Sequence, residues 1–395
     1  MNQQPDPACA SDRDDPTIAW GEARTGDILL ELRRAGEAAT ANLQAKWAKE
    51  TAAAAARVPG VQIEEQGECL FLNALSPGCR ACKDGAWDCI FVTMACNLNC
   101  PFCWSPCAPS PKHLGSARGA NRRASAGGRE LRVSGVSFSG GEPLLDPAAL
   151  LACIGRVKTE SPGCYYWVYT NGLAGDETAF ARVAELGVHE ARFNLAASGY
   201  LDPAAMKRLR FAVNRFAAVT VEIPAIPDDA RRLLEALPRW CEAGVRYLNL
   251  HELVYEPGSN SWSMPGPRCS GNLGDGHVFA YHPESRALTL DVMEKVAADR
   301  LPLGVNDCSL HSKRRQIRGR RRLLAPLMKR EWERLVREAM LETCGIWGRE
   351  TVRLFHPDHL DALRRAHPRA PFVRLLRLAP LQPDEAPQWR GCDPV

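Results

Sequence analysis

Short apolar runs alternate with longer amphipathic stretches through the middle of the chain. The apolar runs lie near residues 89–93, 135–139, 164–169, 189–195, 218–224 and 246–253. Stretches with helical spacing lie between them, at about 147–159, 177–186, 202–215 and 229–242. Strands that alternate with helices favour a parallel sheet joined by helical crossovers. The pattern therefore predicts an α/β domain built on six strands.

The alternation stops on both sides of this region. Leucines and alanines within residues 27–57 predict one or two helices that end before Pro59 and Gly60. After residue 257, a Gly/Pro/Ser-rich stretch precedes a strand-like piece and an arginine-rich part that we expect to be helical. We therefore expect four segments: a disordered tail (1–15), a helical N-terminal extension (16–75), the α/β core (76–256) and a largely helical C-terminal extension (257–395).

Composition favours a reducing compartment. The chain has 395 residues, 16 cysteines and a formal net charge of +4. The first 15 residues are polar and show no apolar signal-peptide core, and no apolar run approaches the ~18 residues of a membrane span. We therefore expect a cytoplasmic protein with no membrane partner, whose clustered cysteines bind metal rather than form disulfides. The small net charge disfavours nucleic acid as a partner.

Three cysteines directly follow the first apolar run of the core. Cys96, Cys100 and Cys103 have the spacing C-x3-C-x2-C. Thiolates clustered this tightly can bind one iron–sulfur cluster, and three of them would leave one iron of a four-iron cluster open to a small molecule. Cys107 extends the run to four cysteines, so a closed electron-transfer cluster or a structural zinc site is also compatible with the spacing.

A second motif ends the next apolar run. Residues 140–143 read Gly140, Gly141, Glu142 and Pro143 after an alternating strand. Two glycines allow the main chain to come close to a ligand without a Cβ clash. The Glu142 carboxylate suits a position facing an ammonium group.

In this order and at this distance, the two motifs resemble the signature of the radical S-adenosylmethionine (SAM) superfamily, with Phe102 as the aromatic residue before the third cysteine. The resemblance implies a partial (β/α)6 TIM-type barrel with helical N-terminal and C-terminal extensions. It implies a [4Fe-4S] cluster on Cys96, Cys100 and Cys103, with SAM bound to its open iron and to the turn at 140–143. A reductant such as flavodoxin or ferredoxin would then trigger cleavage of SAM to a 5′-deoxyadenosyl radical, which abstracts hydrogen from a substrate.

Polar residues at the ends of the later strands are candidates for the rest of the site, because chemistry in a parallel barrel occurs at the carboxyl ends of its strands. The segments that resemble SAM-contacting segments of the superfamily supply Thr170, Asn171, Asn194, Ser198 and Glu222. His251 and Glu252 are our candidates for substrate contact or proton transfer. Asn249 and His251 alternate with leucines, as expected of a strand that faces a pocket. The alternative for each is a satisfied polar residue at a strand end.

A second cysteine group brackets the core. Cys79 and Cys82 form a C-x2-C pair upstream, on what we expect to be a tight loop, and Cys308 lies far downstream. Their order around the other motifs resembles a group of uncharacterised radical SAM proteins related to pyruvate formate-lyase activating enzyme, over about residues 78–322. These three thiols are candidates for a second iron–sulfur cluster, another metal or a substrate thiol. The alternative is three unliganded cysteines. Cys269, Cys344 and Cys392 are too scattered for an auxiliary domain of the SPASM type.

The substrate is the least determined part of the prediction. Residues 313–322 carry seven cations, which suit a phosphate, an acidic peptide or RNA, although a solvated helix face is the commoner explanation. We expect either a peptide or protein side chain, including glycyl-radical activation, or a small metabolite; nothing resembles a cobalamin-binding domain. The competing hypothesis is a non-enzymatic iron–sulfur or zinc protein for electron transfer or redox sensing, which requires Cys107 as a fourth ligand.

Overall fold

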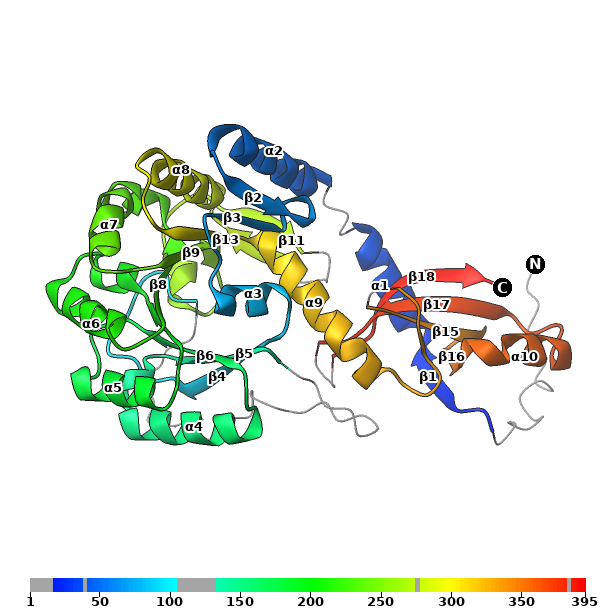
Figure 1. The fold of residues 1–395 in the computed structure, drawn as a ribbon. Helices are drawn as coiled ribbons and strands as arrows, with labels where there is room; N and C mark the ends of the chain where they lie inside the picture. The colour runs from blue at the N-terminus through cyan, green and yellow to red at the C-terminus, as the bar shows by residue number, and fades with distance from the viewer. Residues whose placement is uncertain (1–16, 38–40, 105–132, 274–277, 338, 382–384) are drawn as a thin grey trace.

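The computed structural model describes residues 17–37, 41–104, 133–273, 278–337, 339–381 and 385–395. These residues form two lobes (Figure 1): an α/β lobe that contains most of the chain, and a smaller lobe built on an antiparallel sheet. No described helix is both long enough and apolar enough to cross a membrane.

The α/β lobe is built on one sheet, which has nine strands in the described part of the chain, in the order β2-β3-β13-β9-β8-β7-β6-β5-β4. The strands from β4 to β9, together with β13, are parallel. At one edge, β3 pairs antiparallel with β13, and β2 pairs antiparallel with β3. Their bounds are β2 Val61–Glu64, β3 Cys69–Leu72, β4 Trp87–Thr93, β5 Gly135–Gly140, β6 Tyr165–Thr170, β7 Glu190–Phe193, β8 Ala218–Ala225, β9 Tyr247–Glu252 and β13 Gly304–Cys308. The predicted α/β class is confirmed, and all six predicted strands are present.

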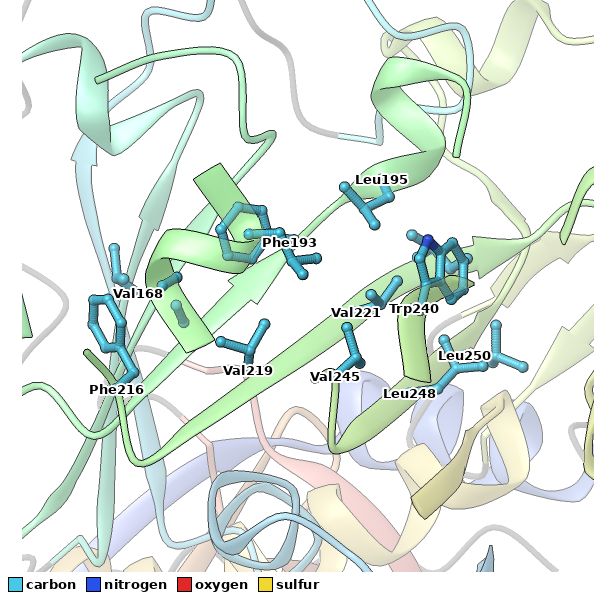
Figure 2. Packing of buried hydrophobic residues seen from close by; sticks show 14 of the residues in the cluster. Val168, Phe193, Leu195, Phe216, Val219, Val221, Trp240, Val245, Leu248 and Leu250 are labelled. Atoms are coloured by element: carbon cyan, nitrogen blue, oxygen red, sulfur yellow. The ribbon is translucent and has the colours of Figure 1, made fainter. Parts of the chain in front are cut away.

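Helices connect successive strands and cover the outer face of the sheet (Figure 1). They are α4 Pro147–Glu160, α5 Glu177–Glu185, α6 Pro203–Val213, α7 Ala230–Glu242 and α8 Ser285–Ala298. Asp146, Asp176 and Asp202 begin three of them, because each aspartate side chain accepts a hydrogen bond from a free backbone N–H of the first turn. Figure 2 shows the core beneath, where Val219, Val221, Leu248 and Leu250 of β8 and β9 pack in one cluster with Trp240 of α7.

Two further helices cover the inner side of the sheet. These are α3 Pro77–Lys83, where the sequence suggested a tight loop, and α9 Leu310–Met328. The turn that follows α3 packs closely on α9, since a Cβ on Gly85, whose φ is +72°, would lie 2.1 Å from the backbone nitrogen of Arg320. Side chains of α3, α9 and strands from β4 to β13 line one small cavity. The sheet therefore curves around an interior space, although no pairing joins β4 to β2 among the described strands.

The smaller lobe differs from the largely helical C-terminal extension that we expected. In the described chain its sheet has six antiparallel strands: β1 Trp20–Arg24, β14 Arg334–Leu335, β15 Met340–Trp347, β16 Thr351–Phe355, β17 Phe372–Leu378 and β18 Gln388–Pro394. The expectation of a largely helical part from residue 257 onward is wrong. In β16, Val352 and Leu354 are buried while Thr351 and Arg353 are exposed, which is the period-2 pattern of a strand. Arginines at exposed positions hid this alternation.

The N-terminal extension is likewise only partly helical. Helices α1 Thr25–Glu37 and α2 Ala41–Arg57 are present as predicted, but β1 pairs with β16 in the smaller lobe. Ile28 of α1 packs against Val352, Leu354 and Leu375 of that sheet, and α10 Leu360–Ala366 packs on a separate apolar cluster. A third sheet, of β10 Val254–Tyr255, β11 Cys269–Asn272 and β12 Val278–Tyr281, lies after β9.

The basic run of residues 313–322 lies within α9 and forms ion pairs inside the protein. Arg315 contacts Glu64 at 3.0 Å and Asp84 at 2.8 Å, Arg318 contacts Glu65 at 2.7 Å, and Arg320 contacts Asp88 at 2.7 Å. The run therefore fastens α9 to the segments around β2, α3 and β4. A ligand-binding role of the run stays a prediction.

Candidate functional site

The three cysteines of the first motif lie in the loop after β4, at the carboxyl end of the parallel strands. A short helical turn, η6 Asn260–Ser263, holds this loop. Asn260 Nδ2 donates to Asn99 Oδ1 at 2.6 Å and to the Cys100 carbonyl at 3.0 Å, and the Ser261 backbone N–H donates to the Cys103 carbonyl at 3.0 Å. Sequence reasoning missed Asn260 and Ser261, because they lie far along the chain in a stretch without periodicity.

The thiols of this loop influence one another. Burial raises the pKa of Cys100 to about 12, with contributions from the neighbouring Cys103 and Cys96, and burial also raises the pKa of Cys96. Among the described residues, no three His, Cys, Asp or Glu side chains are placed as the ligands of one metal ion. A soft, all-thiol donor set is nevertheless the type that iron–sulfur clusters use, and bound iron supplies the positive charge that thiolates need. Cys107 lies outside the described residues.

The two glycines of the second motif lie against the backbone that leads into the cysteine loop. A Cβ on Gly140, whose φ is +136°, would lie 1.9 Å from the Thr93 carbonyl oxygen, and one on Gly141 would lie 2.2 Å from that of Ala95. The backbone N–H of Gly141 donates to Thr93 at 2.7 Å, and that of Glu142 donates to Ala95 at 2.8 Å. Close packing of this turn against the segment before the cysteine loop is thus enough to explain why both positions are glycine.

Glu142 occupies a different environment from the one expected. Its side chain is fully buried, and its oxygens accept from Leu144 N at 3.0 Å, Asn171 N at 2.6 Å and Thr170 Oγ1 at 3.2 Å. Burial raises the pKa of Glu142 to about 7, against the opposing effect of these three donors. The carboxylate therefore ties the turn after β5 to the turn after β6, and Pro143 is the buried first residue of η3 Pro143–Leu145.

The remaining predicted cofactor residues lie in three different environments. Asn171 Nδ2 donates to Asn97 Oδ1 at 2.7 Å and lies 3.9 Å from Cys96 Sγ, so Asn171 joins the cysteine loop. Asn194 and Ser198, by contrast, make hydrogen bonds within η4 Leu195–Ser198. Phe102 packs in an apolar cluster with Ile226, Leu253 and Tyr255.

The second cysteine group lines the cavity inside the curved sheet. Cys79 and Cys82 come from α3 and Cys308 from the end of β13. The cavity measures about 40 Å³. Its other lining residues are Lys83, Trp87, Tyr169, Arg192, Glu222, Asn249, His251, Asn306, Ser312, Lys313 and Gln316. The structure thus brings Cys308 together with two cysteines from the opposite end of the α/β lobe's sequence.

Glu222 and His251 belong to this cavity. Glu222 Oε1 lies 2.7 Å from His251 Nε2, and Glu222 Oε2 accepts from Arg192 Nη1 at 2.6 Å. Cys308 is the register partner of His251 in the β13–β9 pair, and Lys313 lines the same cavity. Burial alone would raise the pKa of Cys308, but Lys313 and His251 outweigh it and lower this pKa to about 6. Burial would lower the pKa of His251, yet Cys308 and Glu222 raise it to about 9.

Glu252 does not join His251, because successive residues of a strand point to opposite faces of the sheet. Its side chain is buried on the other face, where Oε2 accepts from Leu310 N at 2.8 Å and Oε1 lies 4.0 Å from Lys46 Nζ. The predicted pair of His251 and Glu252 is therefore divided between the interior cavity and the start of α9.

A larger cavity of about 570 Å³ lies near the amino ends of β9 and β13. Its lining includes Leu72, Tyr247, Val296 and Leu301, with Arg246 and Arg300. None of the residues predicted for the site lines it.

Residues 90–264 match the sequence model of the radical SAM superfamily, and this stretch contains both the cysteine loop and the turn at 140–143. This part of the chain is therefore similar to a radical SAM domain. A Methanocaldococcus jannaschii protein, provisionally named a glycyl-radical enzyme activating enzyme, is 25% identical over 200 residues, covering 46% of this chain and 51% of that protein. The chain thus spans about half the length of this curated relative.

Two solved structures align with the chain at a low level of similarity. Streptococcus suis SuiB bound to SAM aligns with a TM-score of 0.39 and 14% identity, over 55% of this chain and 49% of SuiB. SuiB bound to its precursor peptide SuiA aligns with a TM-score of 0.38 and 14% identity, over 55% and 47% of the two chains. Similarity at this level says nothing about the substrate of the present protein.

Proposed function

We propose that this protein is a radical SAM enzyme whose core is a partial (β/α)6 barrel extended by β13. The observation that carries the proposal is the direct contact between the two motifs: the loop with Cys96, Cys100 and Cys103 is hydrogen-bonded to the turn at 140–143 at the carboxyl end of β4 and β5. Such strand ends are where parallel barrels carry their chemistry.

In this proposal the three cysteines hold a [4Fe-4S] cluster, and residues of the neighbouring turns hold SAM. When bound, the cluster and SAM supply a 5′-deoxyadenosyl radical once a reductant of the flavodoxin or ferredoxin type delivers an electron. Gly140, Gly141 and Pro143 shape the turn that contacts SAM. Glu142 keeps that turn in place through Thr170 and Asn171, and Asn171 also orients the cysteine loop. Phe102 shields the loop from water, and Asn194 and Ser198 are proposed to complete the SAM contacts.

The interior cavity is the proposed place of substrate contact. His251, held by Glu222, is positioned to move a proton at its Nδ1 or Nε2 atom, and Asn249 lies beside it on the cavity wall. The substrate class, a peptide or a small metabolite, stays a prediction, as do the proton-transfer role of Glu252 and a cytoplasmic location. A second cluster on Cys79, Cys82 and Cys308 also stays a prediction, which iron analysis of the Cys79→Ala/Cys308→Ala variant tests.

The decisive experiment measures 5′-deoxyadenosine. The anaerobically reconstituted protein is reduced, mixed with SAM and assayed by liquid chromatography and mass spectrometry. We expect 5′-deoxyadenosine above the background of Cys96→Ala, which removes a cluster ligand. Cys153→Ala, a partly buried cysteine of α4 outside the site, is the matched control and should retain the activity.

Two results would contradict the proposal. One is a fully loaded cluster whose EPR spectrum does not change with SAM and which forms no 5′-deoxyadenosine. The other is loss of the cluster in Cys107→Ala, because an open three-cysteine site does not need a fourth thiol. Either result would favour an electron-transfer or redox-sensing protein.

A further inference from the structure

The larger cavity lies at the opposite end of the parallel strands from the cysteine loop. It measures about 570 Å³ and is lined by residues of α8, by the first residues of β9 and β13, and by the segment that follows β3. This volume is within the usual range of small-molecule sites, about 300–1,000 Å³. Parallel barrels carry their chemistry at the carboxyl ends of the strands. A ligand at this amino end would therefore be bound without being converted.

The lining of this cavity is positively charged. It includes Arg246 and Arg300 but neither a carboxylate nor a lysine from the described part of the chain. The Arg246 guanidinium lies 5.7 Å from the centroid of the Tyr247 ring, which also lines the cavity, and donates to the Ala217 carbonyl at 3.2 Å. The Arg300 guanidinium makes no hydrogen bond or ion pair with any described residue. Two arginines without an acidic partner favour a ligand with a negative charge.

Arg300 occupies a backbone position that favours glycine. It follows the last turn of α8, where its backbone N–H donates to the Ala297 carbonyl at 3.2 Å and that of Leu301 donates to the Val296 carbonyl at 3.0 Å. These two hydrogen bonds form a Schellman motif, in which the left-handed residue is usually glycine. Arg300 has a φ of +52°, so its side chain strains the backbone. Strained residues of this kind collect at ligand sites, and a ligand contact would explain an arginine here.

Apolar side chains supply much of the remaining wall. Leu72 of β3 and Val296 of α8 are buried, Leu301 is partly buried, and the Tyr247 ring lies beside Arg246. An inorganic anion would leave this apolar surface in contact with water. The wall therefore favours a ligand that also carries an apolar or aromatic group.

We propose that this cavity is a binding site for a small molecule in which an oxyanion, either a carboxylate or a phosphate, is joined to an apolar or aromatic body. Arg246 and Arg300 bind the oxyanion, while Tyr247, Leu72 and Leu301 contact the body. No covalent bond forms or breaks. The site is separate from the cysteine loop and from the interior cavity, so binding here does not depend on SAM chemistry.

The test measures binding by isothermal titration calorimetry. The anaerobic full-length protein, with its first cluster in place, is titrated in phosphate-free buffer without SAM. The probes are phenyl phosphate and benzoate, which each join an oxyanion to an aromatic ring. Benzyl alcohol, which lacks the charge, and inorganic phosphate, which lacks the ring, are the matched controls.

We expect one aromatic anion per chain, bound on the order of tenfold more tightly than either control, as the loss of one charged hydrogen bond predicts. Tighter binding of phenyl phosphate would identify a phosphate as the preferred oxyanion, and tighter binding of benzoate would identify a carboxylate.

Variants separate binding from folding. Arg300→Gly relieves the left-handed backbone, so it should not lower the midpoint of urea unfolding, yet it should weaken binding of the aromatic anion on the order of tenfold. Arg246→Gln should weaken binding to a similar extent. Arg182→Gln, an exposed arginine of α5 outside the cavity lining, is the matched control and should change neither the affinity nor the midpoint.

Three results would overturn the inference. One is the absence of saturable binding of both aromatic anions at millimolar concentration. Another is equal affinity for an aromatic anion and for either control, because the site would then not recognise both charge and body. The third is wild-type affinity in Arg300→Gly and Arg246→Gln, which would place the anion elsewhere. All three are independent of whether the protein forms 5′-deoxyadenosine, so the proposed function is tested separately.

Discussion

At the scale of single residues, the turn at 140–143 is constrained by contacts within the protein. Gly140 and Gly141 lie against the carbonyl oxygens of Thr93 and Ala95, and the Glu142 side chain is buried under three donors. These contacts hold the turn against the loop that begins at Ala95. A motif that resembles a ligand-binding sequence can therefore also pack two loops of a site against each other.

We predict that Gly141→Ala lowers the free energy of unfolding by about 1–3 kcal/mol, the usual cost of overpacking, and weakens cluster retention. The added Cβ would lie 2.2 Å from the Ala95 carbonyl oxygen, so the cysteine loop must shift. Chemical denaturation and iron content during dilution measure the two effects.

Gly155→Ala in α4 is the matched control for this substitution. Apart from the backbone of its own helix, no atom lies within 4 Å of the position that a Cβ would take there, and alanine is favoured over glycine in a helix by about 1 kcal/mol. Equal effects of the two substitutions would refute the packing explanation.

At the scale of elements, α9 connects the parts of the α/β lobe. Its arginines pair with acidic residues around β2, α3 and β4, while Lys313 faces the interior cavity. Its first turn packs on α2, where the His311 ring stacks on Trp47 with 4.7 Å between centroids. One helix thus closes the inner side of the sheet and supplies Ser312, Lys313 and Gln316 to the lining of the cavity.

We predict that acid weakens the docking of α9 through His311. Burial, with the nearby cations Arg286, Arg314 and Lys83, lowers the pKa of His311 to about 3, while the charge of Asp307 acts in the opposite direction. Because the unfolded chain binds the proton more readily, stability is lost as the pH falls from about 6.5 towards 3. The slope is at most about 1.4 kcal/mol per pH unit.

The measurement compares urea unfolding of the wild type and His311→Gln between neutral and mildly acidic pH. The variant should show a shallower decline on acidification. His359→Gln, in the smaller lobe, is the control and should retain the wild-type slope. Identical slopes for wild type and His311→Gln would exclude His311 as the titrating group.

At the scale of the whole molecule, the two lobes are joined through α9 (Figure 1). Arg321 is 2% exposed and donates to the Ala379 carbonyl and, at 2.9 Å, to Glu385 Oε1. Beside it, Ala325 of α9 packs with Ala339, Leu341 and Ala379 of the smaller lobe. The smaller lobe contributes no side chain to the lining of the interior cavity in the described chain, so its connection to α9 is its link to the site.

We predict that Arg321→Ala loosens the smaller lobe from α9. The substitution removes the Arg321 donor from the Ala379 carbonyl and the cation from beside the Glu385 carboxylate, at a cost of about 2–4 kcal/mol for a largely buried charged contact. Limited proteolysis should cut the substituted protein faster between the lobes. Arg364→Ala, exposed on α10, should leave the cleavage rate unchanged, and an unchanged rate for Arg321→Ala would contradict this role.

The local pattern of the sequence determined much of this protein. The period of the apolar residues predicted six core strands and the helices between them, because side-chain alternation and helical spacing are local properties. The two motifs likewise indicated the similarity to radical SAM proteins, which residues 90–264 bear out, and the loop that contains Cys96, Cys100 and Cys103. The strands of the smaller lobe were missed because Arg353 and Arg374 occupy exposed positions of β16 and β17.

Only the tertiary structure decided which distant residues meet. It placed Cys79, Cys82 and Cys308 in one cavity, put Glu222 beside His251, and separated Glu252 from both. It also turned the basic run into ion pairs and gave Asn260 a role at the cysteine loop. The physical reason is that pairing of distant strands and the burial of charges depend on the register of the whole sheet, which no local pattern specifies.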